Sequence, residues 1–224
     1  MNLFEKVAKP IKTGKKSFDI FECIKELKSK RPIFVSEADF QVELSWIIIK
    51  NYPDAKVRCE YIPSFDPDMH IDILVIKDDK WIPIELKYKT KGCVKNLGGE
   101  SFNLKNQGAK DIGCYLYLND IQRIERIKMN VPSFAKGYTI LLTNEQSYMK
   151  KPRKESCYYR EFALTEGEIK KGILNWADNT GTGTKKGIDE PILLLGEYPI
   201  HWEKYSSVDN SNSGTFWYLV NTVN

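Results

Sequence analysis

Polar and apolar positions follow a helical period from residue 36 and a strand period soon after it. Ser36 is a suitable N-cap, and Asp39 lies in the first turn of the apolar-rich segment EADFQVELSWIIIKNY, which predicts a helix ending near Tyr52. Residues 56–62, KVRCEYI, alternate between polar and apolar side chains and predict a first strand. Residues 1–35 are basic with one amphipathic stretch, and we interpret them as an N-terminal extension.

Two further strand-like runs, residues 70–76 and 81–88, flank the polar tetrad KDDK. Both runs are rich in β-branched and aromatic residues, so the four polar residues between them predict a hairpin turn. With the turn centred between Asp78 and Asp79, one face of the hairpin is apolar and anchors both strands in a core. The side chains on that face are Ile71, Ile73, Val75, Ile82, Ile84 and Leu86.

The second half of the chain predicts helices, strands and two loops. Residues 96–100 contain two glycines and predict a loop, and apolar spacing predicts helices over 102–118 and from Asp120 onward. The Gly- and Thr-rich segment 179–187 predicts a surface loop; because it lacks GxxxxGK[ST], it is not a nucleotide-binding loop. Strand-like segments follow the helices at 137–143, 191–195 and 215–220.

The order of these elements predicts an α/β layered domain. A helix, three strands, a helix and a strand follow one another, and further strands come after them. The length of 224 residues fits a single domain. We therefore expect a core over residues 36–150, preceded by the extension 1–35 and followed by a C-terminal extension over 151–224.

Composition and charge restrict the function classes without selecting one. Hydrophobic residues make up 42% of the chain and charged residues 29%, a balance typical of a folded protein and not of a disordered one. The net charge of +4 permits a polyanionic partner but does not by itself indicate one. No apolar run approaches the roughly 20 residues of a membrane span, and the amino terminus carries charges where a signal peptide is apolar. We expect a cytoplasmic protein that does not enter a membrane.

Cysteine and histidine usage bears on metal chemistry. The five cysteines lie at wide, unequal spacings with no CxxC, and there are two histidines, His70 and His201. This pattern disfavours both a zinc site and a disulfide framework. Any bound metal is therefore expected to have oxygen ligands, as magnesium and manganese do.

Three charged residues share the polar face of the predicted hairpin. In the register set by the KDDK turn, Asp72 lies directly opposite Glu85, with Cβ atoms about 4.5–5.5 Å apart, and Lys87 projects from the same face. Opposed carboxylates cost roughly 0.2–1 kcal/mol, and a divalent cation would reverse that sign because both groups supply hard oxygen ligands. The alternative is an acidic surface hairpin in which Lys87 offsets Glu85.

Asp72, twelve intervening residues and then Glu85-Leu86-Lys87 resemble the motif of the PD-(D/E)XK nuclease superfamily. The resemblance covers about residues 36–145 and includes the order helix, strand, hairpin, helix, strand. It implies a restriction-endonuclease-like fold: three α/β/α layers around a central mixed sheet, here with additional C-terminal strands. It also implies that Asp72 and Glu85 bind magnesium, with manganese as a substitute, and that Lys87 assists the attacking water. A literal Pro-Asp pair ends at Asp68, but Asp68 precedes the strand and cannot pair across to Glu85.

The resemblance implies two further site residues on helices. Many members place a glutamate on the helix before the first strand, and both Glu37 and Glu43 qualify here. Because six residues turn a helix by about 240°, at most one of them faces the hairpin, and the SEADFQ start favours Glu37. Related nucleases often have a polar residue, frequently Gln, on the helix after the hairpin, which implies a role for Gln107. The exonuclease-type pattern has Tyr four residues later, whereas this chain has Asp111.

Basic residues gather in two places that a nucleic-acid backbone could contact. One group follows the second strand of the hairpin, and the other, at 150–154, precedes Tyr158 and Tyr159. The simpler interpretation of any one of these lysines is an exposed charged loop. The first group contains Lys87, Lys89, Lys91 and Lys95, and the second Lys150, Lys151, Arg153 and Lys154.

The sequence therefore predicts a magnesium-dependent nuclease acting on DNA, with no nucleotide cofactor. The family resemblance favours an endonuclease of restriction, defence or repair type. One alternative is a non-catalytic nucleic-acid-binding or interaction protein on the same fold; another is a single-metal hydrolase of smaller phosphate esters. Since one such site cuts one strand, cleavage of both strands would call for a homodimer.

Overall fold

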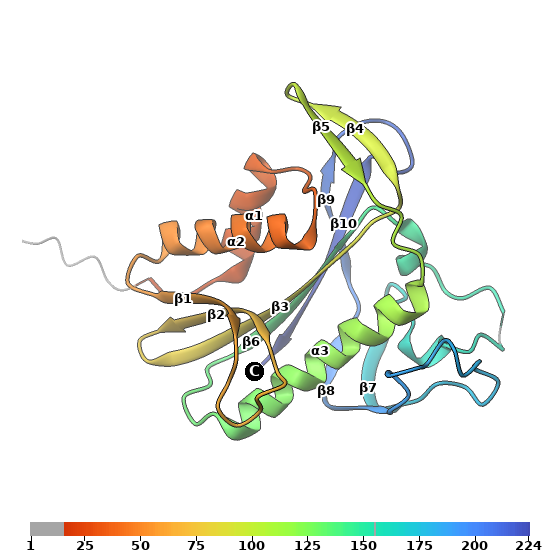
Figure 1. Ribbon diagram of the computed structural model, residues 1–224. Helices are drawn as coiled ribbons and strands as arrows, with labels where there is room; N and C mark the ends of the chain where they lie inside the picture. The colour runs from red at the N-terminus through yellow and green to blue at the C-terminus, as the bar shows by residue number, and fades with distance from the viewer. Residues whose placement is uncertain (1–15, 155) are drawn as a thin grey trace, which may run out of the picture.

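The computed structural model describes residues 16–154 and 156–224, which form a mixed α/β fold around a six-stranded sheet (Figure 1). The helices are α1 (Ile20–Lys30), α2 (Glu37–Asn51) and α3 (Lys110–Asn130), with short 3-10 turns η1 (Gln146–Met149) and η2 (Arg160–Phe162). The strands are β1 (Lys56–Tyr61), β2 (Ile71–Lys77), β3 (Lys80–Lys89), β4 (Cys93–Leu97), β5 (Glu100–Leu104), β6 (Gly137–Thr143), β7 (Ile169–Leu174), β8 (Ile192–Pro199), β9 (Trp202–Ser207) and β10 (Thr215–Val223).

The central sheet is mixed, with the strand order β1-β2-β3-β6-β10-β9. Neighbouring strands pair antiparallel except β3 and β6, which pair in parallel. The chain makes the parallel connection through α3, because parallel neighbours need a long crossover. Two small two-stranded sheets, β4–β5 and β7–β8, stand beside the central one. The predicted class, α/β with a central mixed sheet, is confirmed.

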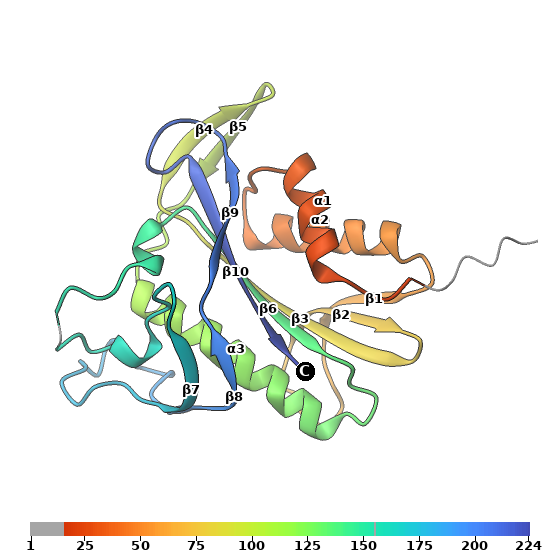
Figure 2. The same ribbon diagram turned by 180° about the vertical axis from the view of Figure 1, so that it is seen from behind.

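Helices cover both faces of the central sheet (Figures 1 and 2). Strand β6 illustrates the division, since all its residues are buried and successive side chains point to opposite faces. Ile140 and Leu142 pack into a cluster that contains the buried residues of α1 and α2. Leu141 packs on the other side with buried residues of α3. The β6 segment reads as a continuous apolar run because it is buried on both faces.

The β2–β3 hairpin has the predicted register. Ile73 pairs with Ile84, and Asp78 and Asp79 form the turn with φ of +50° and +58°. Two positive φ values are those of a type I′ turn, whose twist matches the flanking strands. Extending this register places Asp72 opposite Glu85. Ile71, predicted on the same face as Ile73, instead packs with Leu74 in a separate cluster, so that part of the prediction is wrong. The helix α2 and the strands β1 and β6 also lie where their patterns predict, and Ser36 caps α2 by accepting a hydrogen bond from the Asp39 amide.

The described part of the predicted N-terminal extension belongs to the core. Asp19 caps the N-terminus of helix α1, and one side of this helix is buried against α2 and the sheet. The buried side chains recur at helical spacing, so the amphipathic stretch in the sequence is the contact face of a helix. Residues 1–15 of the predicted extension lie outside the described residues. The buried side chains of α1 are Ile20, Cys23, Ile24 and Leu27.

The helix predicted over 102–118 is wrong in its first half. Phe102 lies in β5 and pairs with Lys95 of β4, and Gly98 and Gly99, with φ of +59° and +84°, form the turn between these strands. The predicted loop 96–100 is therefore the tip of a second hairpin. Helix α3 then begins at Lys110 and continues for 21 residues, so the two predicted helices are one.

Residues 151–224 contribute two strands of the central sheet. Strand β10 pairs with the whole length of β6, and β9 pairs with β10. The predicted strands at 191–195 and 215–220 are β8 and β10, whereas β7 and β9 were not predicted. Among the described residues, no helix combines the length and apolar character required to cross a membrane.

Candidate active site at the β2–β3 hairpin

The backbone ladder between β2 and β3 ends one residue short of Asp72. Beyond that point, carboxylate side chains accept the hydrogen bonds that the backbone amides of β3 donate. Asp72 Oδ2 accepts from the Leu86 amide at 2.6 Å, and Glu37 Oε2, from the first turn of α2, accepts from the Tyr88 amide at 2.6 Å. The two acids therefore lie where the strands separate, and the charge-assisted bonds hold them there.

Glu37, and not Glu43, reaches the hairpin. Glu43 forms an ion pair with Arg31, which also contacts Asp39 at 2.9 Å. The helical rotation between the two glutamates accounts for this difference. A cavity of about 300 Å³ opens beside the hairpin, lined by Glu37, Ala38, Gln41, Glu60, Asp72 and Leu86.

Glu85 faces α3 and is almost fully buried, with 1% of its surface exposed. Neither carboxylate oxygen has a hydrogen-bond donor among the described residues. The guanidinium of Arg123 lies 3.2 Å from Oε1 without alignment for a hydrogen bond. Burial, reinforced by the charge of Asp120, raises the pKa of Glu85 well above its ordinary value. An ionised Glu85 therefore requires additional positive charge.

Lys87 contacts α3 through Asp120. Its Nζ lies 2.5 Å from Asp120 Oδ2 and 3.1 Å from the Leu86 carbonyl oxygen. Burial alone would lower the pKa of Lys87, but the charge and contact of Asp120 outweigh burial and hold this pKa above its ordinary value. Lys87 is therefore a positive charge in this arrangement, which favours charge neutralisation over removal of a proton from water.

Asp120 and Arg123 complete a network that the sequence analysis missed. Arg123 Nη1 lies 3.2 Å from Asp120 Oδ1, and Nη2 lies 3.2 Å from Glu85 Oε1. The four charges thus alternate in sign as Glu85, Arg123, Asp120 and Lys87. A signal was present, because Asp120 begins the second predicted helix and Arg123 follows at i+3. The sequence pattern did not show which face of β3 this helix covers.

Gln107 does not join the carboxylates. It lies in the loop before α3, where its side-chain Oε1 accepts from the Thr90 backbone amide at 2.9 Å and its backbone amide donates to the Thr90 carbonyl at 2.8 Å. These bonds close the base of the β4–β5 hairpin. The implied position of Gln107 on a helix is therefore wrong. Asp111 is on α3 and accepts from the Tyr158 hydroxyl at 2.8 Å.

The donor set at the hairpin limits which metal could bind. Among the described residues, no group of three or more His, Cys, Asp or Glu side chains is arranged to hold a metal ion. Asp72 and Glu85 could supply two carboxylates. Magnesium is commonly held by one or two carboxylates, with water and substrate phosphate as the other ligands. The buried Glu85 oxygens that lack donors fit such a hard cation.

Comparisons with protein-family models, with curated proteins and with solved structures found no match for this chain. The assignment of a function to the hairpin therefore depends on its own residues. These are Glu37, Asp72, Glu85 and Lys87, with Asp120 and Arg123 from α3.

The titration of Asp72 makes folding stability depend on pH. Burial raises the pKa of Asp72 to about 6, against the opposing effects of Lys87 and the Leu86 amide. In the unfolded chain this carboxyl titrates near 3.9, so between these values the folded state binds the proton more strongly. Stability therefore rises as pH falls through this window and declines as pH rises through it.

We expect Asp72→Asn to remove this contribution. Between pH 7 and pH 5, wild type should gain about 1 kcal/mol more in free energy of unfolding than the variant does. Urea unfolding at the two pH values measures the difference, with Asp68→Asn, in the exposed loop before β2, as the matched control. An identical pH response in wild type and Asp72→Asn would contradict the raised pKa.

Proposed function

We propose that this protein is a metal-dependent nuclease that hydrolyses phosphodiester bonds in DNA, with a restriction-endonuclease-like fold of the PD-(D/E)XK type. The observation that carries the proposal is the buried Glu85 carboxylate without a hydrogen-bond donor, two residues before Lys87 and one residue beyond the end of the β2–β3 ladder, where Asp72 lies on the other strand. The order α2, β1, β2, β3, α3, β6, with the β4–β5 hairpin inserted before α3 and with β3 and β6 parallel, supports it. The endonuclease subtype, of restriction, defence or repair type, remains part of the proposal.

Each residue of the site has a separate task in this proposal. Asp72 and Glu85 would hold magnesium, or manganese in its place, whose chemistry is to polarise a phosphoryl oxygen and to activate water at neutral pH. Lys87 supplies positive charge beside the reacting phosphate, and Asp120 fixes its ammonium group through the 2.5 Å contact. Arg123 orients Glu85. Fixed charges of this kind stabilise a transition state because they need no reorganisation.

A non-catalytic nucleic-acid-binding protein on the same fold is the second candidate. One observation favours it: Arg123 and Lys87 already compensate the negative charges of Glu85 and Asp120. A balanced buried network can be purely structural. Catalysis, by contrast, requires Glu85 to exchange part of its interaction with Arg123 for a cation.

Nicking of supercoiled plasmid DNA separates the two candidates. We expect nicked circles with magnesium, no reaction with EDTA, and recovery on addition of manganese. Glu37→Gln should slow the reaction because Glu37 shares the cavity with Asp72, whereas Glu43→Gln, on the same helix but paired with Arg31, should not.

Two other outcomes of this assay are informative. Binding of DNA without nicking in any divalent metal would reject the nuclease and support the second candidate. Linear product that forms without accumulation of nicked circles would indicate two sites acting together, as in a homodimer.

A further inference from the structure

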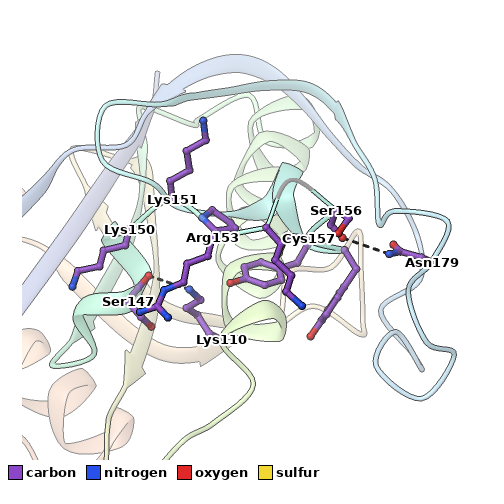
Figure 3. Close-up of a pocket in the computed structure, with 12 residues that line it drawn as sticks. Lys110, Ser147, Lys150, Lys151, Arg153, Ser156, Cys157 and Asn179 are labelled. Carbon is purple, nitrogen blue, oxygen red and sulfur yellow. Dashed lines mark hydrogen bonds between the residues drawn. The ribbon is translucent and has the colours of Figure 1, made fainter.

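A cavity of about 650 Å³ lies at the start of α3, between that helix and the segment that follows η1 (Figure 3). It is separate from the β2–β3 site, and positively charged side chains dominate its lining. Lys110 and Arg153 point into the same part of the cavity (Figure 3). Tyr158 and Tyr159 supply aromatic surface beside them. The cationic lining residues are Lys110, Lys150, Lys151, Arg153 and Lys154.

These positive charges have no acidic partner in the part of the chain that the structure describes. The charged ends of the four cationic residues within 150–154 make neither ion pairs nor hydrogen bonds there. Lys110 donates to the Ser147 carbonyl at 3.0 Å and lies 5.3 Å from the centre of the Tyr159 ring. Asp111, the adjacent acid on α3, is engaged by the Tyr158 hydroxyl. Like charges gathered around one cavity repel one another, so a bound polyanion would stabilise them.

The positive surface extends toward the candidate active site. A second cavity of about 340 Å³ shares Ser147 and Lys150 with the first. It is also lined by Lys91 and by Glu145, whose carboxylate accepts from the Ser147 amide. Lys91 lies two residues beyond the end of β3, the strand that carries Glu85. A compact small molecule binds in a concave pocket with convergent polar groups. Here the exposed cations are spread over two adjoining cavities, which fits an extended chain of phosphates better.

Helix α3 also sets the spacing between this cavity and the site. Lys110 lines the cavity, and Asp120, ten residues later on the same helix, contacts Lys87. Ten helical residues span about 15 Å. Along one DNA strand that length corresponds to about four or five nucleotides.

We propose that this cavity binds the sugar-phosphate backbone of the DNA on which the β2–β3 site acts, about four or five nucleotides from the cleaved bond. This inference rests on the proposed function, because it takes the same DNA as ligand. Backbone contacts carry little sequence information, so the cavity contributes affinity and positioning. Its principal contacts are Lys150, Arg153 and Lys154, with Lys110 at its base.

The test compares two triple variants with the same change in charge. Lys150→Ala/Arg153→Ala/Lys154→Ala removes three contacts. Lys25→Ala/Lys56→Ala/Lys80→Ala, on α1, β1 and the hairpin turn, is the matched control. All six side chains are exposed, so both variants should fold, as circular dichroism can verify. Binding to a 30-base-pair duplex is measured by fluorescence anisotropy in EDTA at several salt concentrations.

We expect the cavity variant to lose affinity on the order of 100-fold at 0.1 M salt, equally for unrelated duplex sequences. The slope of log affinity against log salt should become shallower by about 2.7, which is about 0.9 for each lost phosphate contact. The control variant should change both quantities by much less. Equal losses in the two variants would overturn the proposal, because they would indicate nonspecific attraction to net charge.

Two further arms identify the ligand and separate this inference from the proposed nuclease. If ATP or inorganic phosphate binds through the cavity residues while DNA affinity is unchanged, the backbone assignment is rejected. The same holds if RNA, but not DNA, depends on the cavity. If wild type nicks DNA and the cavity variant binds DNA as tightly as wild type does, only the proposal for the cavity is refuted. Cavity-dependent DNA binding without any nicking refutes the nuclease and leaves the cavity proposal standing.

Discussion

Replacing Glu85 with glutamine is expected to abolish plasmid nicking without lowering the stability of the fold. The activity loss, roughly 10³-fold or more, follows from removal of a charge that the reaction needs. Stability should not fall because both Glu85 oxygens lack hydrogen-bond donors and burial raises the pKa of this carboxyl well above its ordinary value. The folded environment thus disfavours the ionised form, which the neutral amide replaces. Arg123 retains its contact with Asp120.

Glu125 provides a matched control, since it is also a buried glutamate and belongs to α3, the helix that Glu85 faces. Its carboxylate accepts from the Leu195 and Gly196 amides at 3.0 and 2.8 Å, and from the Tyr198 hydroxyl at 2.6 Å. Glu125→Gln should therefore cost about 1–3 kcal/mol of stability and leave the nicking rate of the folded protein unchanged. Urea unfolding at pH 7 gives both free energies. Nicking that persists in Glu85→Gln would remove Glu85 from the site.

The second large effect is expected at Asp120. Asp120→Ala would leave Lys87 and Arg123 in a buried setting without their shared carboxylate, and loss of one partner from a buried ion pair costs about 3–5 kcal/mol. Combining Asp120→Leu with Lys87→Met removes both charges of the closest pair, so most of that loss should be recovered. The unfolding free energies of wild type, Asp120→Leu, Lys87→Met and the double variant form a double-mutant cycle that measures the coupling.

An exposed ion pair calibrates this result. Lys171 and Glu197 lie 2.8 Å apart, but more than half of each side chain is exposed. Glu197→Ala should therefore cost no more than about 1 kcal/mol. If Asp120→Ala costs as little as Glu197→Ala, the network on α3 does not hold Lys87 in place. The proposed role of Asp120 as a positioning residue would then be wrong.

Local patterns predicted the hairpin correctly because its determinants are local. The Asp78–Asp79 turn set the register, and β2 is buried on both faces, with Ile73 in the cluster of α1 and α2 and Leu74 in a separate one. A one-residue slip would turn every side chain to the other face. The register predicts Asp72, Glu85 and Lys87 on one face; in the structure Glu85 and Lys87 contact α3, whereas Asp72 lines the cavity beside α2.

The same reasoning failed where a strand and a helix share a residue pattern. The segment around Phe102 and Leu104 reads as helical when it is joined to the apolar residues of α3, yet these two side chains alternate as in a strand. The glycines at 98 and 99 are as suitable for a hairpin turn as for a loop. Pairing with β4, a tertiary contact, selects the strand, and this is why Gln107 lies outside α3.

The sequence by itself determined the α/β class and the register of the β2–β3 hairpin, because periods and turns act over a few residues. Only the tertiary structure decided which charges meet. It placed Asp120 and Arg123 of α3 beside Lys87 and Glu85, and it selected Glu37 over Glu43 on α2. It also gathered Lys110 and the 150–154 segment around one cavity. These contacts join residues far apart in the chain, and packing across the sheet, which no local pattern encodes, brings them together.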